Sequence, residues 1–281
     1  MKGGEGNPDP VVVLMTDFGV DDTYVGQMKG VILSICPHAR IVDLTHAIAP
    51  QHIELGAFFL ERALPFLPQR SIVVCVVDPG VGTSRKPLAL RTGHHTFLGP
   101  DNGLLTPVLD MNGLSGCVSI TNQDIMLPRQ SATFHGRDLF SPAAAHLAGG
   151  FPFGRLGEPV APSSCVRLPA KGCRVQSDGS IAGHILFADR FGNLVTTIDT
   201  SLCANPREWR IETEGIPPLS VMETYGDKRE GELLAYGGSF GTVEIAVRNG
   251  SAAERTGVRE GAAARLVRVA GTTAENREAK A

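Results

Sequence analysis

The sequence lacks the features that mark several common classes of protein. It has no cluster of Lys and Arg, and a net charge of −3 with a pI near 6.2 argues against a nucleic-acid-binding surface. No apolar run approaches membrane-spanning length, and the Gly- and Pro-rich start has no signal-peptide core. We therefore expect a cytoplasmic protein that acts on a small molecule and binds neither nucleic acid nor membrane.

Closely spaced cysteine pairs are also missing. The six cysteines lie mostly in apolar segments, where a free thiol behaves as a small hydrophobic group. This usage indicates a reducing compartment and predicts no metal site. The six positions are Cys36, Cys75, Cys117, Cys165, Cys173 and Cys203.

Familiar catalytic motifs are absent as well. The chain has no GxxxxGK[ST] phosphate loop, no HExxH, no GxSxG elbow and no GxGxxG at a strand-to-helix turn. ATPases, zinc proteases, esterases of the α/β-hydrolase fold and dinucleotide enzymes therefore lose support. His94 and His95 have no acidic neighbours that would complete a metal site, so a solvated hairpin turn is expected there.

Short apolar strands alternate with amphipathic segments in the first half of the chain. This alternation predicts an α/β domain with a mostly parallel sheet flanked by helices. Strands are expected over 11–15, 40–45, 71–77 and 116–120, a hairpin over 88–98, and helices over 22–36, 51–67, 104–111 and 136–148.

Beyond residue 172 the pattern changes to short strands separated by turn residues, which is typical of a small antiparallel β-barrel or sandwich. Strands are expected there over 181–188, 194–198, 209–214, 233–236, 242–247 and 264–269. The expected organisation is a flexible N-terminus 1–10, an α/β domain 11–150, a Pro- and Gly-rich linker 151–172, a barrel domain 173–270 and a flexible tail 271–281.

One stretch, VVDPGVGTSR at 76–85, combines a buried strand with an acid and a glycine-rich corner. The strand stops at Asp78, and the following Pro and two glycines let the backbone approach a ligand. An acid in this place lies where open α/β sheets bind ligands. Asp before Pro-Gly also caps turns, so this stretch alone leaves both readings open.

Further polar motifs stand at the ends of other elements. They are MTDFG at 15–19, GPDNG at 99–103, FHGRD at 134–138, DRFGN at 189–193 and GSFG at 238–241. Singly, each fits a helix cap, an ion pair or a turn. In this order, and with the stretch at 76–85, they resemble the S-adenosyl-L-methionine (SAM) hydroxide adenosyltransferases, or SAM hydrolases, which are related to the SAM-dependent fluorinase and chlorinase.

The resemblance runs from about Val11 to Val269. It implies an N-terminal α/β domain, a C-terminal β-barrel and a homotrimer whose active sites lie between neighbouring subunits. It implies no cofactor, because SAM is the substrate.

By position, the resemblance implies that Asp78, Arg85 and His135 position and activate water. Asp17 matches the acid that holds the ribose hydroxyls. The remaining substrate-binding candidates are Asp189 and Ser239 for the methionine end, Asn193 for adenine, Phe18, Phe191 and Phe240 around the adenosyl group and sulfonium, and Asn249.

The expected reaction is hydrolysis of SAM to adenosine and L-methionine by attack of activated water or hydroxide on ribose C5′. Asp78 stands where the halogenases carry Tyr, Val81 where they carry Thr, and Gly136 where the fluorinase has Ser. These differences favour water over halide. Two alternatives stay open, a chlorinase-like SAM-dependent halogenase and a non-catalytic regulator that binds SAM or adenosine.

Overall fold

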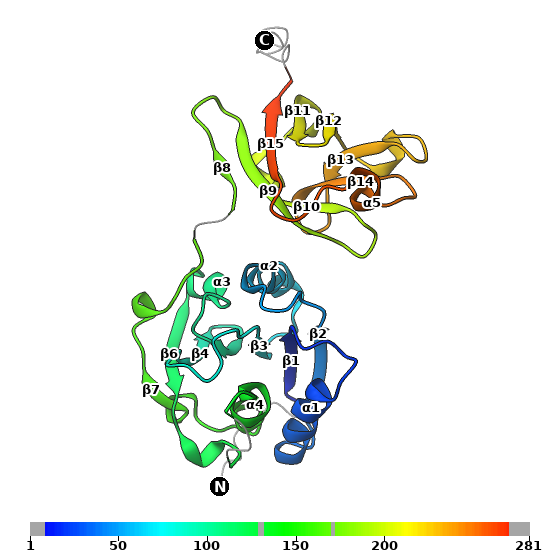
Figure 1. Cartoon of the computed structure of the whole chain (residues 1–281). Helices are drawn as coiled ribbons and strands as arrows, with labels where there is room; N and C mark the ends of the chain where they lie inside the picture. Colours follow the sequence, from blue (N-terminus) through cyan, green and yellow to red (C-terminus); the bar gives the residue numbers. More distant parts are fainter. Residues whose placement is uncertain (1–8, 129–131, 170–171, 270–281) are drawn as a thin grey trace. The chain divides into compact units, whose positions relative to one another are not determined.

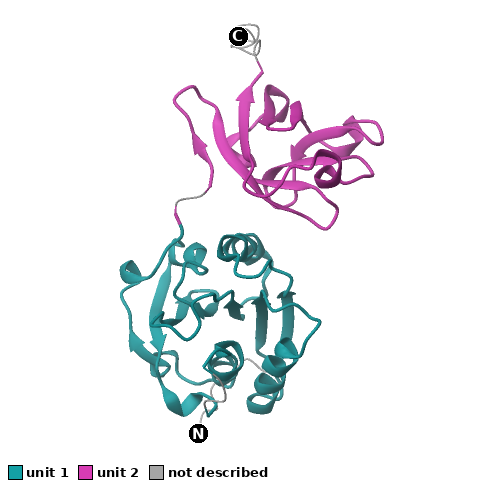
Figure 2. Cartoon of the chain, in the orientation of Figure 1, with its two compact units in different colours: residues 1–168 teal, residues 169–281 magenta. Residues whose placement is uncertain are grey.

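The computed structural model describes residues 9–128, 132–169 and 172–269. The chain divides into two compact units, residues 1–168 and residues 169–281 (Figure 2). The first unit is an α/β structure and the second is built almost entirely of strands (Figure 1).

A seven-stranded sheet forms the centre of the first unit. Its strand order is β2 (Arg40–Thr45), β1 (Val11–Thr16), β3 (Ile72–Val76), β5 (Thr96–Pro100), β4 (Pro87–Thr92), β6 (Leu114–Ile120) and β7 (Gly157–Pro159). The pairs from β2 to β5 are parallel and the pairs from β5 to β7 are antiparallel. The predicted α/β sheet is confirmed, and its parallel part comprises the strands expected first in the chain.

Helices cover both faces of this sheet (Figure 1). α1 (Tyr24–Ile35) and α4 (Ser141–Ala148) pack against each other on one face, and α2 (Ile53–Ala63) and α3 (Thr106–Leu109) lie on the other. Alternate strand residues face the two layers, as the pleat requires. α3 is a single turn and not the longer helix expected over 104–111, because Gly103, at φ +100°, and Pro107 confine its start.

The second unit contains a closed barrel of seven strands. Around the barrel they are β9 (Ile181–Ala188), β10 (Leu194–Asp199), β14 (Thr242–Val247), β13 (Leu233–Gly237), β12 (Ile216–Met222), β11 (Trp209–Thr213) and β15 (Ala263–Arg268). Pairing of β9 with β10 closes the barrel, and the two-residue strand β8 (Arg174–Val175) extends β9. The predicted barrel is confirmed, although one of its pairs, β12 with β13, is parallel.

The barrel encloses its own hydrophobic core. Trp209, the single tryptophan of the chain, is 4% exposed in this core, and the guanidinium of Arg268 lies 4.8 Å from the centre of its ring. A short helix, α5 (Ala252–Thr256), follows β14 and packs against it.

Several local features differ from expectation. The strand β12 was not expected. The stretch 151–172, expected as a linker, includes the short strand β7, which pairs with β6. His95 is buried, 8% exposed, against Phe97, so the expectation of a solvated turn is wrong for this residue. Burial lowers the pKa of His95, and neighbouring His94 adds to this effect.

The described residues include no helix that is long and apolar enough to cross a membrane. All six cysteines are free thiols, and five of them are buried. Cys117 and Cys165 are neighbours, with their sulfur atoms 3.8 Å apart.

Candidate active site

Two acids follow adjacent parallel strands at the same edge of the first sheet. β1 ends at Thr16 and is followed by Asp17, and β3 ends at Val76, two residues before Asp78. The backbone N–H of Asp17 donates to the carbonyl oxygen of Val76 over 3.4 Å. The strand pairing thus brings the loops that carry both acids together, at the edge where open α/β sheets place ligands.

The loop after Asp78 folds back so that Arg85 reaches the acid. Thr83 shapes this return, because its hydroxyl donates to the carbonyl of Gly80 over 2.7 Å and accepts the N–H of Arg85 at 3.3 Å. Gly82 has φ +82°, a conformation that glycine adopts without strain.

Asp78 and Arg85 form a buried two-pronged ion pair. Arg85 Nε donates to Asp78 Oδ1 over 3.0 Å, and Nη2 donates to Oδ2. The side chains of Asp78 and Arg85 are only 4% and 8% exposed. Two parallel charge-assisted hydrogen bonds fix the guanidinium plane as well as its position.

His135 is the third member of this group. Arg85 Nη2 lies 2.7 Å from His135 Nδ1. A guanidinium has only donors, so Nδ1 accepts, and a neutral imidazole then carries its proton on Nε2. His135 immediately precedes the π-helical turn Gly136–Phe140, where the Ser141 hydroxyl donates to the carbonyl of Gly136 over 2.8 Å.

One nitrogen of Arg85 is left over from these contacts. Nη1 is buried and has no hydrogen-bond partner within the described part of the chain. An unpaired buried donor costs about 1–3 kcal/mol, and more when the group is charged. The N–H groups on Nη1 are therefore a natural place for an oxygen atom of a ligand or water.

Phe134, the residue before His135, belongs to a cluster of three aromatic rings. Phe18, Tyr24 and Phe134 form three edge-to-face contacts, with ring centres 5.1 to 6.0 Å apart. A Cβ at Gly136 would lie 3.1 Å from the Phe18 ring and 3.2 Å from Met28 Sδ. The packing therefore leaves little room for a side chain at Gly136.

Asp17 is held by a backbone donor from another loop. The N–H of Gln51 donates to Asp17 Oδ2 over 2.8 Å. Gln51 has φ +67°, which is uncommon for a residue with a side chain. The other carboxylate oxygen of Asp17 is not part of this contact.

In the second unit, Asp189 organises the loop between β9 and β10. Its Oδ1 accepts the N–H groups of Phe191 at 2.9 Å and Asn193 at 2.8 Å, and its Oδ2 accepts from Asn193 Nδ2 at 3.0 Å. Asn193 is buried by this arrangement, whereas the Phe191 side chain is 77% exposed. Asp189 thus shapes its own loop, which the sequence motif did not indicate.

The remaining candidates stand on other loops of the barrel unit. Ser239 and Phe240 lie in the turn between β13 and β14, where Ser239 is exposed and the Phe240 ring lies 5.8 Å from that of Phe187. Asn249 is exposed in the turn after β14, with φ +56°.

A buried carboxylate lies beneath the turn that carries Ser239. Glu244 is 3% exposed and accepts from the Tyr236 hydroxyl over 2.6 Å. Burial and the charge of Asp189 raise the pKa of Glu244, and the bond from Tyr236 only partly opposes them. A Cβ at Gly238 would lie 1.8 Å from Glu244 Oε1, so only glycine fits there.

The predicted residues therefore fall into two sets. Asp17, Phe18, Asp78, Arg85 and His135 lie in the first unit, and Asp78, Arg85 and His135 are in direct contact. The candidates of the second unit are Asp189, Phe191, Asn193, Ser239, Phe240 and Asn249.

Sequence analysis assigned no role to several residues that support the first set. Asn102 Nδ2 donates to the carbonyl of Val77 over 2.8 Å, directly before Asp78. Thr16, His46 and Gln51 hold the segment around Asp17. Asn102 and Thr16 lie within or beside quoted motifs, whereas no sequence signal identified His46 or Gln51.

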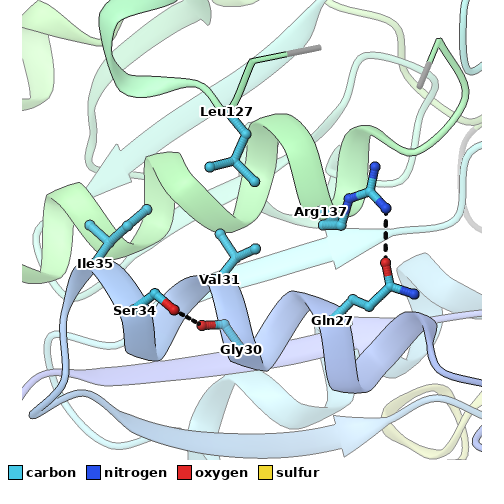
Figure 3. A pocket seen from close by; sticks show the side chains of 7 residues that line it. All are labelled: Gln27, Gly30, Val31, Ser34, Ile35, Leu127 and Arg137. Carbon is cyan, nitrogen blue, oxygen red and sulfur yellow. Dashed lines mark hydrogen bonds between the residues drawn. The ribbon is translucent and has the colours of Figure 1, made fainter. Parts of the chain in front are cut away.

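A separate groove of about 360 Å³ lies between α1 and the segments that carry Leu127 and Arg137 (Figure 3). Its mainly apolar lining includes Val31, Ile35 and Leu127, and Arg137 donates to Gln27 at one end over 2.8 Å. None of the predicted site residues lines this groove. Among the residues with described placement, no three or more His, Cys, Asp or Glu side chains gather as metal ligands would.

Comparison with known proteins adds independent information. Residues 12–157 match the model of the SAM hydroxide adenosyltransferase N-terminal domain, and residues 183–265 match that of the C-terminal domain. A protein of Salinispora tropica named (R)-S-adenosyl-L-methionine hydrolase is 41% identical over 256 residues, covering 90% of this chain and 96% of that protein.

Two further relatives are informative. A protein of Thermus thermophilus with the same name is 40% identical, over 91% of this chain and 99% of its own. A fluorinase of Actinopolyspora mzabensis is 26% identical, over 92% and 97%. The crystal structure of an uncharacterized conserved protein from Thermotoga maritima has a TM-score of 0.83 and 34% identity, and the match covers 92% of this chain and all of that one.

Proposed function

The chain belongs to the SAM hydroxide adenosyltransferase family, and from this premise we propose that it hydrolyses SAM to adenosine and L-methionine at Asp78, Arg85 and His135. The observation that carries the assignment of these residues is the buried contact among them, which leaves Arg85 Nη1 without a partner in the described chain. The enzyme is a SAM hydrolase, like the named relatives that share about 40% of its sequence.

The reaction makes one bond and breaks one. The oxygen of water bonds to ribose C5′ while the C5′–sulfur bond breaks, and the bonding electrons stay on sulfur as it becomes the neutral thioether of methionine. Water loses a proton, so the products are adenosine, methionine and one proton. Because a sulfonium leaves without protonation, the protein has to act chiefly on the nucleophile.

In this proposal Arg85 Nη1 binds the attacking oxygen. A fixed positive donor stabilises the negative charge that grows on water as it loses its proton, and it does so most strongly in a buried site. Asp78 accepts two hydrogen bonds from the guanidinium and so fixes its orientation. Nη1 is therefore already oriented before the reaction begins.

The geometry favours Asp78 over His135 as the proton acceptor. Nδ1 of His135 already accepts from Arg85, and Nε2 carries the proton of the neutral ring, so the imidazole has no free lone pair. Each oxygen of Asp78 accepts one bond from Arg85 and keeps further acceptor capacity. His135 then orients Arg85 and the water.

Substrate contacts follow from the same premise. A carboxylate accepts two hydrogen bonds from a cis-diol, which suits Asp17 for the ribose hydroxyls. Phe18, in edge contact with Phe134, is placed to shield the adenosyl group. We propose Asp189 and Ser239 for the methionine end, Asn193 for adenine, and Phe191, Phe240 and Asn249 as further contacts. No cofactor enters the scheme, since SAM supplies the electrophile and water the nucleophile.

Crowding at Gly136 supports water as the nucleophile. A Ser at this position, as in the fluorinase, would place its Cβ 3.1 Å from the Phe18 ring, so the ring would have to shift to admit it. A halide would also approach the carboxylate of Asp78, which repels it.

We also propose that the chain forms a homotrimer, as the resemblance to the family implies, and that it is located in the cytoplasm, as its free thiols favour. Light scattering of the purified protein tests the homotrimer.

The test is to incubate the purified protein with SAM and to separate the products by chromatography, with and without chloride or fluoride. We expect equal amounts of adenosine and methionine at a rate that halide does not change. Asp78→Asn should lower kcat by about 10²-fold or more while SAM still binds. Halide-dependent 5′-halo-5′-deoxyadenosine would identify a halogenase, and binding without turnover would identify a regulator.

A further inference from the structure

A chain of polar contacts outside the predicted site leads to the segment that carries Asp17. His46, directly after β2, is buried with 3% of its side chain exposed, and its Nδ1 lies 2.8 Å from Thr16 Oγ1. Its Nε2 lies 3.1 Å from Asp43 Oδ1. Lys29 on α1 donates to the other oxygen of Asp43 over 2.6 Å.

The direction of these hydrogen bonds can be worked out from the donors available. Thr16 Oγ1 accepts the N–H of Phe18 at 3.2 Å. The Thr16 hydroxyl can then donate to His46 Nδ1, which leaves the imidazole proton on Nε2, 3.1 Å from Asp43 Oδ1. Nε2 itself makes no hydrogen bond within the described residues, so the contact with Thr16 is the hydrogen bond that orients the ring.

The backbone of His46 also binds the segment around Asp17. Its carbonyl accepts the N–H of Gly19 over 2.8 Å. One residue therefore holds the chain at Thr16, immediately before Asp17, and again at Gly19, two residues after it. Asp17 therefore lies in a short bend that hydrogen bonds with His46 hold at both ends.

We propose that His46 is a positioning residue that sets the Asp17 carboxylate for the ribose hydroxyls, and that it thereby contributes to selection of a substrate with an intact diol. This inference rests on the proposed ribose contact of Asp17. His46 does not touch the substrate in this scheme, and it acts through the Thr16 hydroxyl and the bend from Thr16 to Gly19.

The test compares kcat/KM for SAM and for its 2′-deoxyadenosyl analogue in matched variants. Thr16→Val removes the hydroxyl at almost constant shape, whereas Thr16→Ser keeps it. In the same way, His46→Ala removes the hydrogen-bonding side chain, whereas His46→Asn keeps a hydrogen-bonding group. We expect Thr16→Val and His46→Ala to lower the preference for SAM over the analogue by about tenfold, the scale of one buried hydrogen bond, mainly through KM. Thr16→Ser should keep the wild-type preference.

Each other outcome has a defined meaning. If Asp17→Asn removes the preference but Thr16→Val and His46→Ala lower the rates on both substrates equally, His46 has only a structural role and the inference is overturned. If Asp17→Asn leaves the preference unchanged, the ribose contact itself is wrong, while hydrolysis of SAM still stands. Should His46→Ala fail to fold by circular dichroism, His46→Leu takes its place, because Leu fills the buried site without a hydrogen bond, whereas Thr16→Val also removes the acceptor of the Phe18 N–H.

Discussion

Arg85 and His135 are joined by a hydrogen bond of 2.7 Å in which Nη2 donates to Nδ1. The same nitrogen also donates to Asp78, so one guanidinium group connects an acid seven residues away with a histidine fifty residues away. Arg85 is therefore the centre of the proposed site, and Asp78 and His135 bind it from two sides.

The first prediction concerns Arg85 itself. A lysine carries one compact charge and cannot bind Asp78 with two prongs, His135 and the attacking oxygen at the same time. We expect Arg85→Lys to lower kcat by about 10²- to 10³-fold and to change KM far less. Steady-state release of adenosine measures both constants. Lys86→Gln, which changes the neighbouring exposed cation, should leave them unaltered, and an equal loss in that variant would contradict the assignment.

The second prediction concerns the acceptor that His135 presents to Arg85. Its Nδ1 accepts from Arg85 Nη2 over 2.7 Å, so a substitution that removes this acceptor frees the guanidinium to turn. We expect His135→Ala to lower kcat by about 10²-fold and to change KM for SAM far less, whereas His135→Asn, which keeps an amide acceptor, should recover part of the loss. Steady-state release of adenosine measures both constants, and equal losses in the two variants would contradict an accepting role for His135.

The third prediction concerns the stability of the barrel. Burial raises the pKa of Glu244 above its ordinary value of 4.5, so the folded state holds this proton more tightly than the unfolded state does. The contribution of Glu244 to stability is complete below about pH 4.5 and is lost as the pH rises through the folded-state pKa. Glu244→Gln stays neutral at every pH. The Tm of this variant minus the Tm of wild type should therefore increase as the pH rises.

Thermal unfolding followed by circular dichroism at several pH values checks this difference. Glu214→Gln, at an exposed position of the same unit, serves as the control and should show no such trend. A Tm difference between wild type and Glu244→Gln that stays constant with pH would show that Glu244 does not titrate differently on folding.

The fourth prediction concerns thiol reactivity. Alkylation requires the thiolate, and burial raises the pKa of Cys117 to about 12 and also raises that of Cys165. Iodoacetamide at neutral pH should therefore modify half-buried Cys173 in the folded protein well before these two. Peptide mass spectrometry reads the sites, and the denatured protein should react at all six cysteines. Equal rates at Cys117 and Cys173 would contradict this account.

Much of the fold was predictable because local patterns determine it. The strands beginning at Val11 and Arg40 are each followed by helical periodicity, the strand beginning at Ile72 is a continuous apolar run, and the structure pairs all three in parallel. β12 was missed because Pro217 and Pro218 lie inside it, and consecutive prolines are usually a turn signal. Barrel closure by β9 and β10 depends on long-range pairing that no local pattern reveals.

The site was predictable only where the sequence carries a motif. The contact of Asp78 with Arg85 spans one glycine-containing loop, and both residues belong to a single quoted stretch. His46 lies thirty residues from Thr16, and their contact requires β1 and β2 to be paired, with a shift in register between Leu14 and Met15. Lone polar residues of this kind become visible only when the neighbouring strands are in place.

Trp209 gives the molecule an internal optical label. It is the single tryptophan of the chain, it is buried in the barrel, and the cation of Arg268 lies over its ring. Its fluorescence on excitation at the red edge therefore originates from the second unit alone. When that signal is compared with the far-ultraviolet circular dichroism of both units during denaturation, the order in which the two units melt becomes directly observable.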